Sequence, residues 1–133
     1  MFQIEIEPGF SDTDALGHIN NTRLPVWFEN ARKPVFQIFT KTFDFERWPL
    51  ILAHLSIDFL GQIYFNKMVT ITTEIEKIGN SSLTLRQCAW QSEQCVASSS
   101  AVMVYFNYES NSSKSIPDDI RKKLLPHLIH KPD

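Results

Sequence analysis

A single apolar stretch with helical spacing limits what this chain can fold into more than any other feature of its sequence. Between residues 24 and 39, apolar side chains recur at the period of one helix face: Leu24, Trp27, Phe28, Ala31, Val35, Ile38 and Phe39. Asn20 or Asn21 can cap the start of this helix. Pro34 falls inside the pattern and should kink or end the helix near Lys33, because proline has no backbone N–H.

The segments around this helix follow the two-residue period of β-strands. Residues 2–6 alternate apolar and polar side chains before Pro8 and Gly9 end the pattern. Beyond residue 49 the alternation returns. It places one set on one strand face (Ile51, Ala53, Leu55, Ile57, Phe59) and His54, Ser56 and Asp58 on the other.

Two hairpins and a short helix are predicted in the rest of the chain. Residues 68–78 and 83–90 read as strands joined by a turn at residues 79–81, with Leu83, Leu85, Gln87 and Ala89 on one face. A second turn at residues 91–93 leads to a long strand over residues 94–108, whose predicted apolar face holds Val96, Val102, Val104 and Phe106. Pro117, followed by acidic and then basic residues, indicates a short closing helix.

One apolar helix among antiparallel strands predicts an α+β fold in which the sheet wraps around the helix. The sequence shows no repeat and no linker, so residues 1–133 are expected to form one domain. An unpaired strand edge on such a sheet gives a physical motive for self-association.

Charge and composition exclude several functions. The net charge of −2 leaves no field that would attract nucleic acid. The first residues lack a signal-peptide pattern and no window approaches the ~18 apolar residues of a membrane span, so we expect a cytoplasmic protein without membrane contact. Cys88 and Cys95 have no metal-ligand spacing and are predicted to be reduced thiols in strands; no metal site is expected.

The acidic, glycine-containing turn of residues 10–21 lies directly before the predicted helix. A helix start offers unpaired backbone N–H groups and a partial positive charge, which can polarise a carbonyl close to the carboxylate of Asp14. A carboxylate beside an oxyanion donor suggests hydrolysis of an acyl group. The alternative is that Asp12 and Asp14 only stabilise the turn by accepting backbone hydrogen bonds.

Several segments, taken in order, carry a resemblance to a known family. The run from Asp12 to Asn21 (DTDALGHINN) and the segments 27–32, 56–60, 77–82 and 116–117 are similar to the 4-hydroxybenzoyl-CoA thioesterase-like family of hotdog-fold acyl-CoA thioesterases. The resemblance covers roughly residues 2–125. It implies a hotdog fold, two sheets joined edge to edge in a homodimer, often a homotetramer of paired dimers, and catalysis without a cofactor.

The resemblance also implies roles for the acidic turn. Asp14 would be the nucleophile or general base, and the Asn21 backbone N–H the oxyanion donor, with Gly17 allowing the tight turn. His18 would bind the thioester or a catalytic water, or be a structural hydrogen-bonding residue. Glu29 is a reserve carboxylate, although an interaction with Arg32 within the helix is the simpler interpretation.

For the substrate, the resemblance implies coenzyme A contacts around Ser81, Ser82 and Leu83, which would otherwise be plain hairpin residues. The acyl group would lie between the central helix and a neighbouring subunit, against Trp27, Phe28 and Phe59, unless these aromatics are ordinary core. The sequence therefore predicts an acyl-CoA thioesterase. An acyl-carrier-protein thioesterase and a non-catalytic acyl-CoA-binding hotdog protein are the alternatives.

Overall fold

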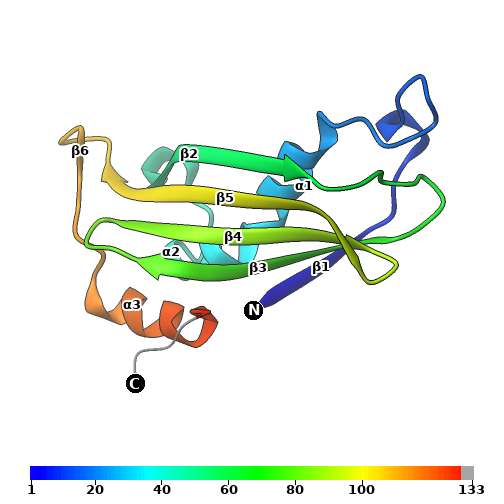
Figure 1. Cartoon of the computed structure of the whole chain (residues 1–133). Helices are drawn as coiled ribbons and strands as arrows, with labels where there is room; N and C mark the ends of the chain where they lie inside the picture. Colours follow the sequence, from blue (N-terminus) through cyan, green and yellow to red (C-terminus); the bar gives the residue numbers. More distant parts are fainter. Residues whose placement is uncertain (130–133) are drawn as a thin grey trace.

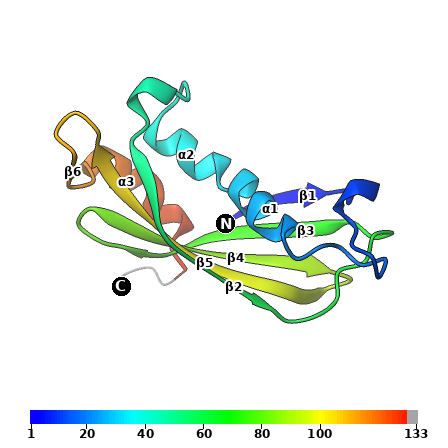
Figure 2. The same ribbon diagram turned by 90° about the horizontal axis from the view of Figure 1, so that it is seen from above.

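The computed structural model, which describes residues 1–129, is a curled antiparallel sheet with two consecutive helices on one face (Figures 1 and 2). The strand order is β1-β3-β4-β5-β2, with a short β6 paired to β5. The strands are β1 (Phe2–Ile6), β2 (Leu50–Phe59), β3 (Val69–Ile78), β4 (Ser82–Gln91), β5 (Gln94–Asn107) and β6 (Ser112–Ser113). The helices are α1 (Arg23–Ala31), α2 (Lys33–Phe39) and α3 (Asp118–Leu124). The predicted α+β class is confirmed.

The predicted helix is present and interrupted where Pro34 indicated. α1 and α2 meet at Arg32, because Pro34 has no N–H to bond the carbonyl of Asn30. The apolar face of α1 is buried against the sheet, where Leu24 and Phe28 are fully covered. The longest α-helix within residues 1–129 has nine residues, and none is long or apolar enough to cross a bilayer.

Buried polar side chains of the sheet fasten this helix break. Gln87 lies in the middle of β4 and donates through Nε2 to the Phe28 carbonyl at 2.9 Å and to Thr73 Oγ1 at 3.0 Å. Its Oε1 accepts from Arg32 Nη1 at 3.2 Å, and Thr73 Oγ1 donates to the Ala31 carbonyl at 3.4 Å. Two carbonyls at the end of α1 thus find their donors in the sheet.

Arg32 is an unusual member of this buried network. Its side chain is 2 % exposed, and its Nε has no hydrogen-bond partner among residues 1–129. Burial lowers the pKa of the guanidinium, an effect that the nearby Glu29 opposes. The predicted Glu29–Arg32 interaction is therefore electrostatic, since no ion pair within 4.0 Å joins the two side chains in the described part of the chain.

Because of two β-bulges, the predicted buried faces of β5 and β2 are partly wrong. Val96 has no partner opposite it on β4, which shifts the alternation along β5. The buried face of β5 is therefore Ala97, Ser99, Ala101 and Met103, and the predicted set Val102, Val104 and Phe106 is only partly buried. On β2 a register shift at Ala53 likewise separates Ile51 from the face of Leu55 and Ile57.

The strand order leaves β2 at one edge of the sheet, where its second edge pairs with no strand within residues 1–129. The strand is ten residues long, and Leu52 on it is 41 % exposed. His54, Ser56 and Asp58 on this strand are exposed. A long edge strand with exposed apolar side chains is normally covered by another element or by another chain.

Candidate active site

The acidic turn that follows β1 is shaped by Asp14. Its backbone N–H donates to the His18 carbonyl at 2.8 Å, and its Oδ1 accepts from the N–H of Leu16 at 2.8 Å and of His18 at 3.2 Å. Gly17 closes the turn with a φ of 81°. Glycine adopts this left-handed conformation readily, whereas any residue with a Cβ atom is strained in it. The Oδ2 atom of Asp14 accepts no hydrogen bond from residues 1–129 and stays available for chemistry.

Asp12 has the structural role predicted for it. Its Oδ2 accepts from the Gly9 N–H at 2.8 Å, and its Oδ1 pairs with Arg23 Nε at 2.6 Å. Partial burial opposes ionisation, but the Gly9 hydrogen bond and the Arg23 guanidinium outweigh it and lower the pKa of the Asp12 carboxyl. Asp12 thereby fastens the acidic turn to the first residue of α1.

The start of α1 presents one backbone N–H without a partner. Asn20 Oδ1 accepts from the Thr22 N–H at 3.0 Å, and the carbonyls of Asn20 and Asn21 accept from Arg23 and Leu24. The predicted cap by Asn20 or Asn21 is not formed: Thr22 is the N-cap residue of α1 and no side chain caps it, while Asn20 closes the turn just before it. The Asn21 N–H donates to no group within residues 1–129. It is an unpaired donor at the positive end of the helix.

A cavity of about 660 Å³ brings these groups together. Asp14, Asn20 and Asn21 line one side, and Phe59 with the segment 60–63 after β2 lines the other. Its size falls in the ordinary range of ligand pockets. The sequence indicated Phe59 but missed residues 60–63, whose only signal was Gly61 at the end of a strand pattern.

His18 lies beside this cavity rather than among the residues that line it. Its ring packs edge-on against Tyr64, with the centroids 5.7 Å apart, and its backbone forms an isolated bridge with the same residue. Both contacts join the acidic turn to the segment after β2.

Trp27 and Phe28 lie in the core of the chain. Trp27 is 6 % and Phe28 0 % exposed, and they pack in one cluster with Ile71 and Ala89 of the sheet. Neither lines the cavity at Asp14. The interpretation of these two aromatics as core, left open by the sequence, fits their positions within this chain.

The structure does not bring Ser81, Ser82 and Leu83 near Asp14 within one chain. Ile6 at the end of β1 pairs with Val69, whereas Leu83 pairs with Ile78 at the other end of β3. Ten residues of strand span roughly 33 Å, so the 79–82 hairpin and the acidic turn lie at opposite ends of the sheet (Figure 1). Leu83 itself is a core residue, 1 % exposed.

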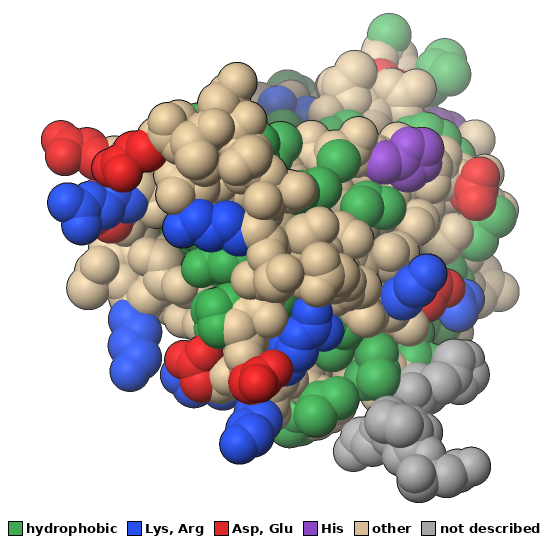
Figure 3. All heavy atoms as spheres, turned by 90° about the vertical axis from the view of Figure 1, so that its left-hand side faces the viewer, with side chains coloured by type: hydrophobic (Ala, Val, Ile, Leu, Met, Phe, Trp, Pro, Cys, Tyr) green, Lys and Arg blue, Asp and Glu red, His purple; other side chains and the backbone are tan. Residues whose placement is uncertain are grey.

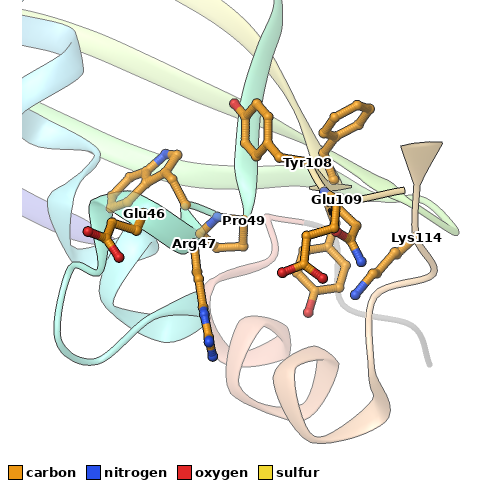
Figure 4. Close-up of a pocket in the computed structure, with 10 residues that line it drawn as sticks. Glu46, Arg47, Pro49, Tyr108, Glu109 and Lys114 are labelled. Atoms are coloured by element: carbon orange, nitrogen blue, oxygen red, sulfur yellow. Dashed lines mark hydrogen bonds between the residues drawn. The ribbon is translucent and has the colours of Figure 1, made fainter. Parts of the chain in front are cut away.

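A second cavity, of about 410 Å³, lies at that opposite end between the start of β2 and the end of β5 (Figure 4). Glu46 and Glu109 balance the charges of Arg47 and Lys114 in its lining. From this end of the molecule, acidic and basic side chains are mixed over the surface rather than gathered by sign (Figure 3). The cavity at Asp14 is the better candidate, because it combines a carboxylate with a free helix-start N–H.

Within residues 1–129, no three His, Cys, Asp or Glu side chains gather in an arrangement that could hold a metal ion. Cys88 and Cys95 are free, partly buried thiols on β4 and β5. Burial raises the pKa of the Cys88 thiol, and the neighbouring Cys95 adds to the effect.

Known proteins share this architecture. A structure of a predicted thioesterase from Bacillus stearothermophilus superimposes with a TM-score of 0.93 at 41% identity, covering 99% of this chain and 98% of that one. A thioesterase from Thermus thermophilus, complexed with coenzyme A and Zn, has the same fold at 24% identity and a TM-score of 0.83, covering 92% of this chain and 96% of that one. The uncharacterized protein YsmA of Bacillus subtilis (strain 168) is 29% identical over 118 residues, 87% of this chain and 80% of YsmA.

The curled antiparallel sheet around a helix is the hotdog fold that the sequence predicted. The model of one family, the thioesterase-like superfamily, matches residues 8–124, from the acidic turn to the closing helix. By this match and by the likeness to the Bacillus stearothermophilus structure, the chain belongs to the thioesterase-like superfamily.

Proposed function

We propose that this protein is an acyl-CoA thioesterase that hydrolyses its substrate in the cavity between the acidic turn and the end of β2. The observation that carries the proposal is that Asn21, whose N–H is unpaired within residues 1–129, and Asp14, whose Oδ2 is free there, line the same cavity. A thioester carbonyl between these two groups would have an attacking carboxylate on one side and an oxyanion donor on the other.

Asp14 can act in two ways. As a nucleophile, its carboxylate oxygen bonds to the acyl carbon, the C–S bond breaks, and the sulfur leaves as coenzyme A thiol after taking up a proton. Water then hydrolyses the mixed anhydride and restores Asp14. As a general base, Asp14 takes a proton from water, and the resulting hydroxide adds to the carbonyl carbon. The C–S bond of this intermediate then breaks, and the proton held by Asp14 passes to the leaving coenzyme A sulfur. In both cases the negative charge on the carbonyl oxygen points at the Asn21 N–H.

The two hydrogen bonds to Asp14 Oδ1 support either role. They fix the carboxylate against the turn, so that Oδ2 needs no reorganisation before it reacts. Gly17 makes this turn possible, and His18, packed on Tyr64, holds it against the segment that follows β2.

A homodimer formed through β2 would explain the position of the 79–82 hairpin. In a two-fold antiparallel pairing of β2 strands, the start of one β2 lies beside the end of the other. Ser82, Val104 and Ile51 stand in one row, so the hairpin lies at the end of the sheet where β2 starts. Ser81 and Ser82 of one protomer would then approach the Asp14 cavity of its partner and contact coenzyme A there.

Coenzyme A is proposed as the thiol carrier because a structural relative from Thermus thermophilus is complexed with it. An acyl-carrier-protein thioesterase would use the same residues and differ only in requiring the carrier. A non-catalytic acyl-CoA-binding protein would have no use for a carboxylate and an unpaired N–H at a helix start in the lining of one cavity.

The test is release of coenzyme A thiol from short, long and aromatic acyl-CoA thioesters by the wild type and Asp14→Asn. The amide oxygen of Asn can still accept from Leu16 and His18, so the turn should persist while the carboxylate is lost. We expect kcat to fall about 10²- to 10⁴-fold while a non-hydrolysable acyl-CoA analogue still binds. Asp119→Asn, an exposed change on α3, is the matched control and should leave kcat unchanged.

A second pair of variants tests the oxyanion donor. Asn21→Ala keeps the backbone N–H and should keep most of the activity, whereas Asn21→Pro removes the N–H and should lower kcat about 10²- to 10³-fold. Equal activity of the Ala and Pro variants would exclude this donor. Saturable binding without turnover of any thioester would instead support the binding protein, and turnover only with acyl-carrier-protein thioesters the carrier-dependent enzyme.

A further inference from the structure

An aromatic loop, defined as Phe43, Phe45 and Trp48 between α2 and β2, presents one ring to the surface, while Phe43 and Trp48 are partly buried. Phe45 is 82 % exposed. The Trp48 ring stacks on Phe43 with centroids 6.0 Å apart and on Phe45 with centroids 5.7 Å apart. A stacked aromatic group of this kind on a surface marks a binding site or an interface.

The backbone of the loop is also strained. Phe43 has a φ of 49°, in the left-handed region that aromatic residues seldom occupy. Packing holds the aromatic loop beside α2, because Phe36 of that helix packs edge-on against Trp48 with the centroids 5.3 Å apart. Between the loop and the outer face of the two helices lies a hollow of about 270 Å³.

The cavity at Asp14 has exposed apolar side chains in one wall. Phe59 in its wall is 53 % and Leu60 60 % exposed. This wall stands at the end of β2, the edge strand of the sheet. No Lys or Arg side chain from the described part of the chain lines it.

A second copy of this chain would bring the two apolar surfaces together. The two-fold axis of an antiparallel strand pair runs perpendicular to the sheet, so both copies keep their helices on the same face. A pairing with its axis at the middle of β2 would place Leu50 of one copy near Phe59 of the other. Because the aromatic loop directly precedes Leu50 and lies on the helix side of the sheet (Figure 2), it would reach the partner's Leu60.

We propose that the aromatic loop of each protomer closes the acyl cavity of its partner, so that Phe45 contacts the acyl group. The inference rests on the proposed thioesterase function and assigns a wall of the site to the second subunit. The Phe45 ring beside the exposed Phe59 and Leu60 favours an aromatic or extended apolar acyl group over acetyl, which is too short to reach the loop.

The first experiment tests the geometry without using activity. In a background with Cys88→Ser and Cys95→Ser, a chain carrying both Phe45→Cys and Leu60→Cys is treated with a bifunctional maleimide. We expect this chain to form a covalent dimer. The control chain carries Gln37→Cys, on the exposed face of α2, together with Leu60→Cys, and should form no covalent dimer. A monomer in solution, or a dimer that is not cross-linked by the first pair, overturns the inference.

The second experiment tests contact with the acyl group. Phe45→Ala should lower kcat/KM for aromatic and long-chain thioesters about tenfold to a hundredfold and leave acetyl-CoA turnover unchanged. Leu125→Ala, which also truncates an exposed apolar side chain, should change neither. Equal loss for every acyl group, or no loss, refutes the assignment of Phe45 while the thioesterase function stands. If the wild type turns over no thioester, the proposed function fails, and the cross-link still decides the subunit geometry.

Discussion

Replacing Gln87 by Leu should lower the free energy of unfolding far more than an exchange between two side chains of similar size usually does. The Gln87 side chain is fully buried, so Leu removes its polar atoms without leaving a large cavity. Three hydrogen bonds disappear: two donated by Nε2, to the Phe28 carbonyl and to Thr73, and one accepted from Arg32.

The magnitude follows from what stays behind. Each lost hydrogen bond costs about 1 kcal/mol net, and a buried partner left unsatisfied costs about 1–3 kcal/mol, more when it is charged. The Arg32 guanidinium already has one buried nitrogen without a partner among residues 1–129 and would lose its contact with Oε1 as well. We expect the free energy of unfolding to fall by roughly 3–5 kcal/mol.

Urea unfolding followed by far-UV circular dichroism, at one fixed protein concentration, measures this difference. Gln94→Leu is the control, because that glutamine is exposed at the start of β5, and it should change the free energy by less than about 0.5 kcal/mol. A loss below about 1 kcal/mol for Gln87→Leu would refute the idea that the polar network fastens the break between α1 and α2.

Two further predictions concern the acidic turn. Gly17→Ala should lower the free energy of unfolding by about 1 kcal/mol, measured by thermal unfolding, because the residue has a φ of 81°. Gly61→Ala is the control and should lower it less, because the added Cβ atom meets only Val96, at 3.7 Å. Equal losses for the two variants would contradict the role of the Gly17 backbone conformation. The lowered pKa of Asp12 stabilises the fold at pH values above the ordinary pKa of 3.8, and this stability is lost as the pH falls through the pKa of the folded state. The difference in unfolding free energy between wild type and Asp12→Asn should therefore shrink on acidification from pH ~6 to pH ~2, and a difference that grows would exclude this role.

The sequence predicted the helices and strands better than it predicted which side chains of each strand are buried. The helical spacing from Leu24 onward and the interruption at Pro34 both hold in the structure. The faces of β2 and β5 were partly wrong, because a bulge moves every later side chain to the opposite face. Periodicity alone does not reveal a bulge, since it depends on how two strands pair.

The candidate site shows the same division. The sequence indicated Asp14, Gly17 and the helix start, because a D-x-D turn before a helix is a local pattern. It did not indicate the cavity wall formed by residues 60–63, which directly follow the last residue of β2. Nor did it indicate that Gln87, predicted on a buried face, would bind carbonyls of α1 and the side chain of Arg32.

Consecutive residues therefore determined the helix, the strands, the turns and the acidic turn beside a helix start, because propensity, capping and side-chain periodicity act over a few residues. The tertiary structure decided which faces are buried, which carbonyl Gln87 satisfies, and that Phe59 and Asp14 line the same cavity. It also placed the hairpin of Ser81 at the opposite end of the sheet. These features depend on pairing and packing between segments tens of residues apart, which no local pattern encodes.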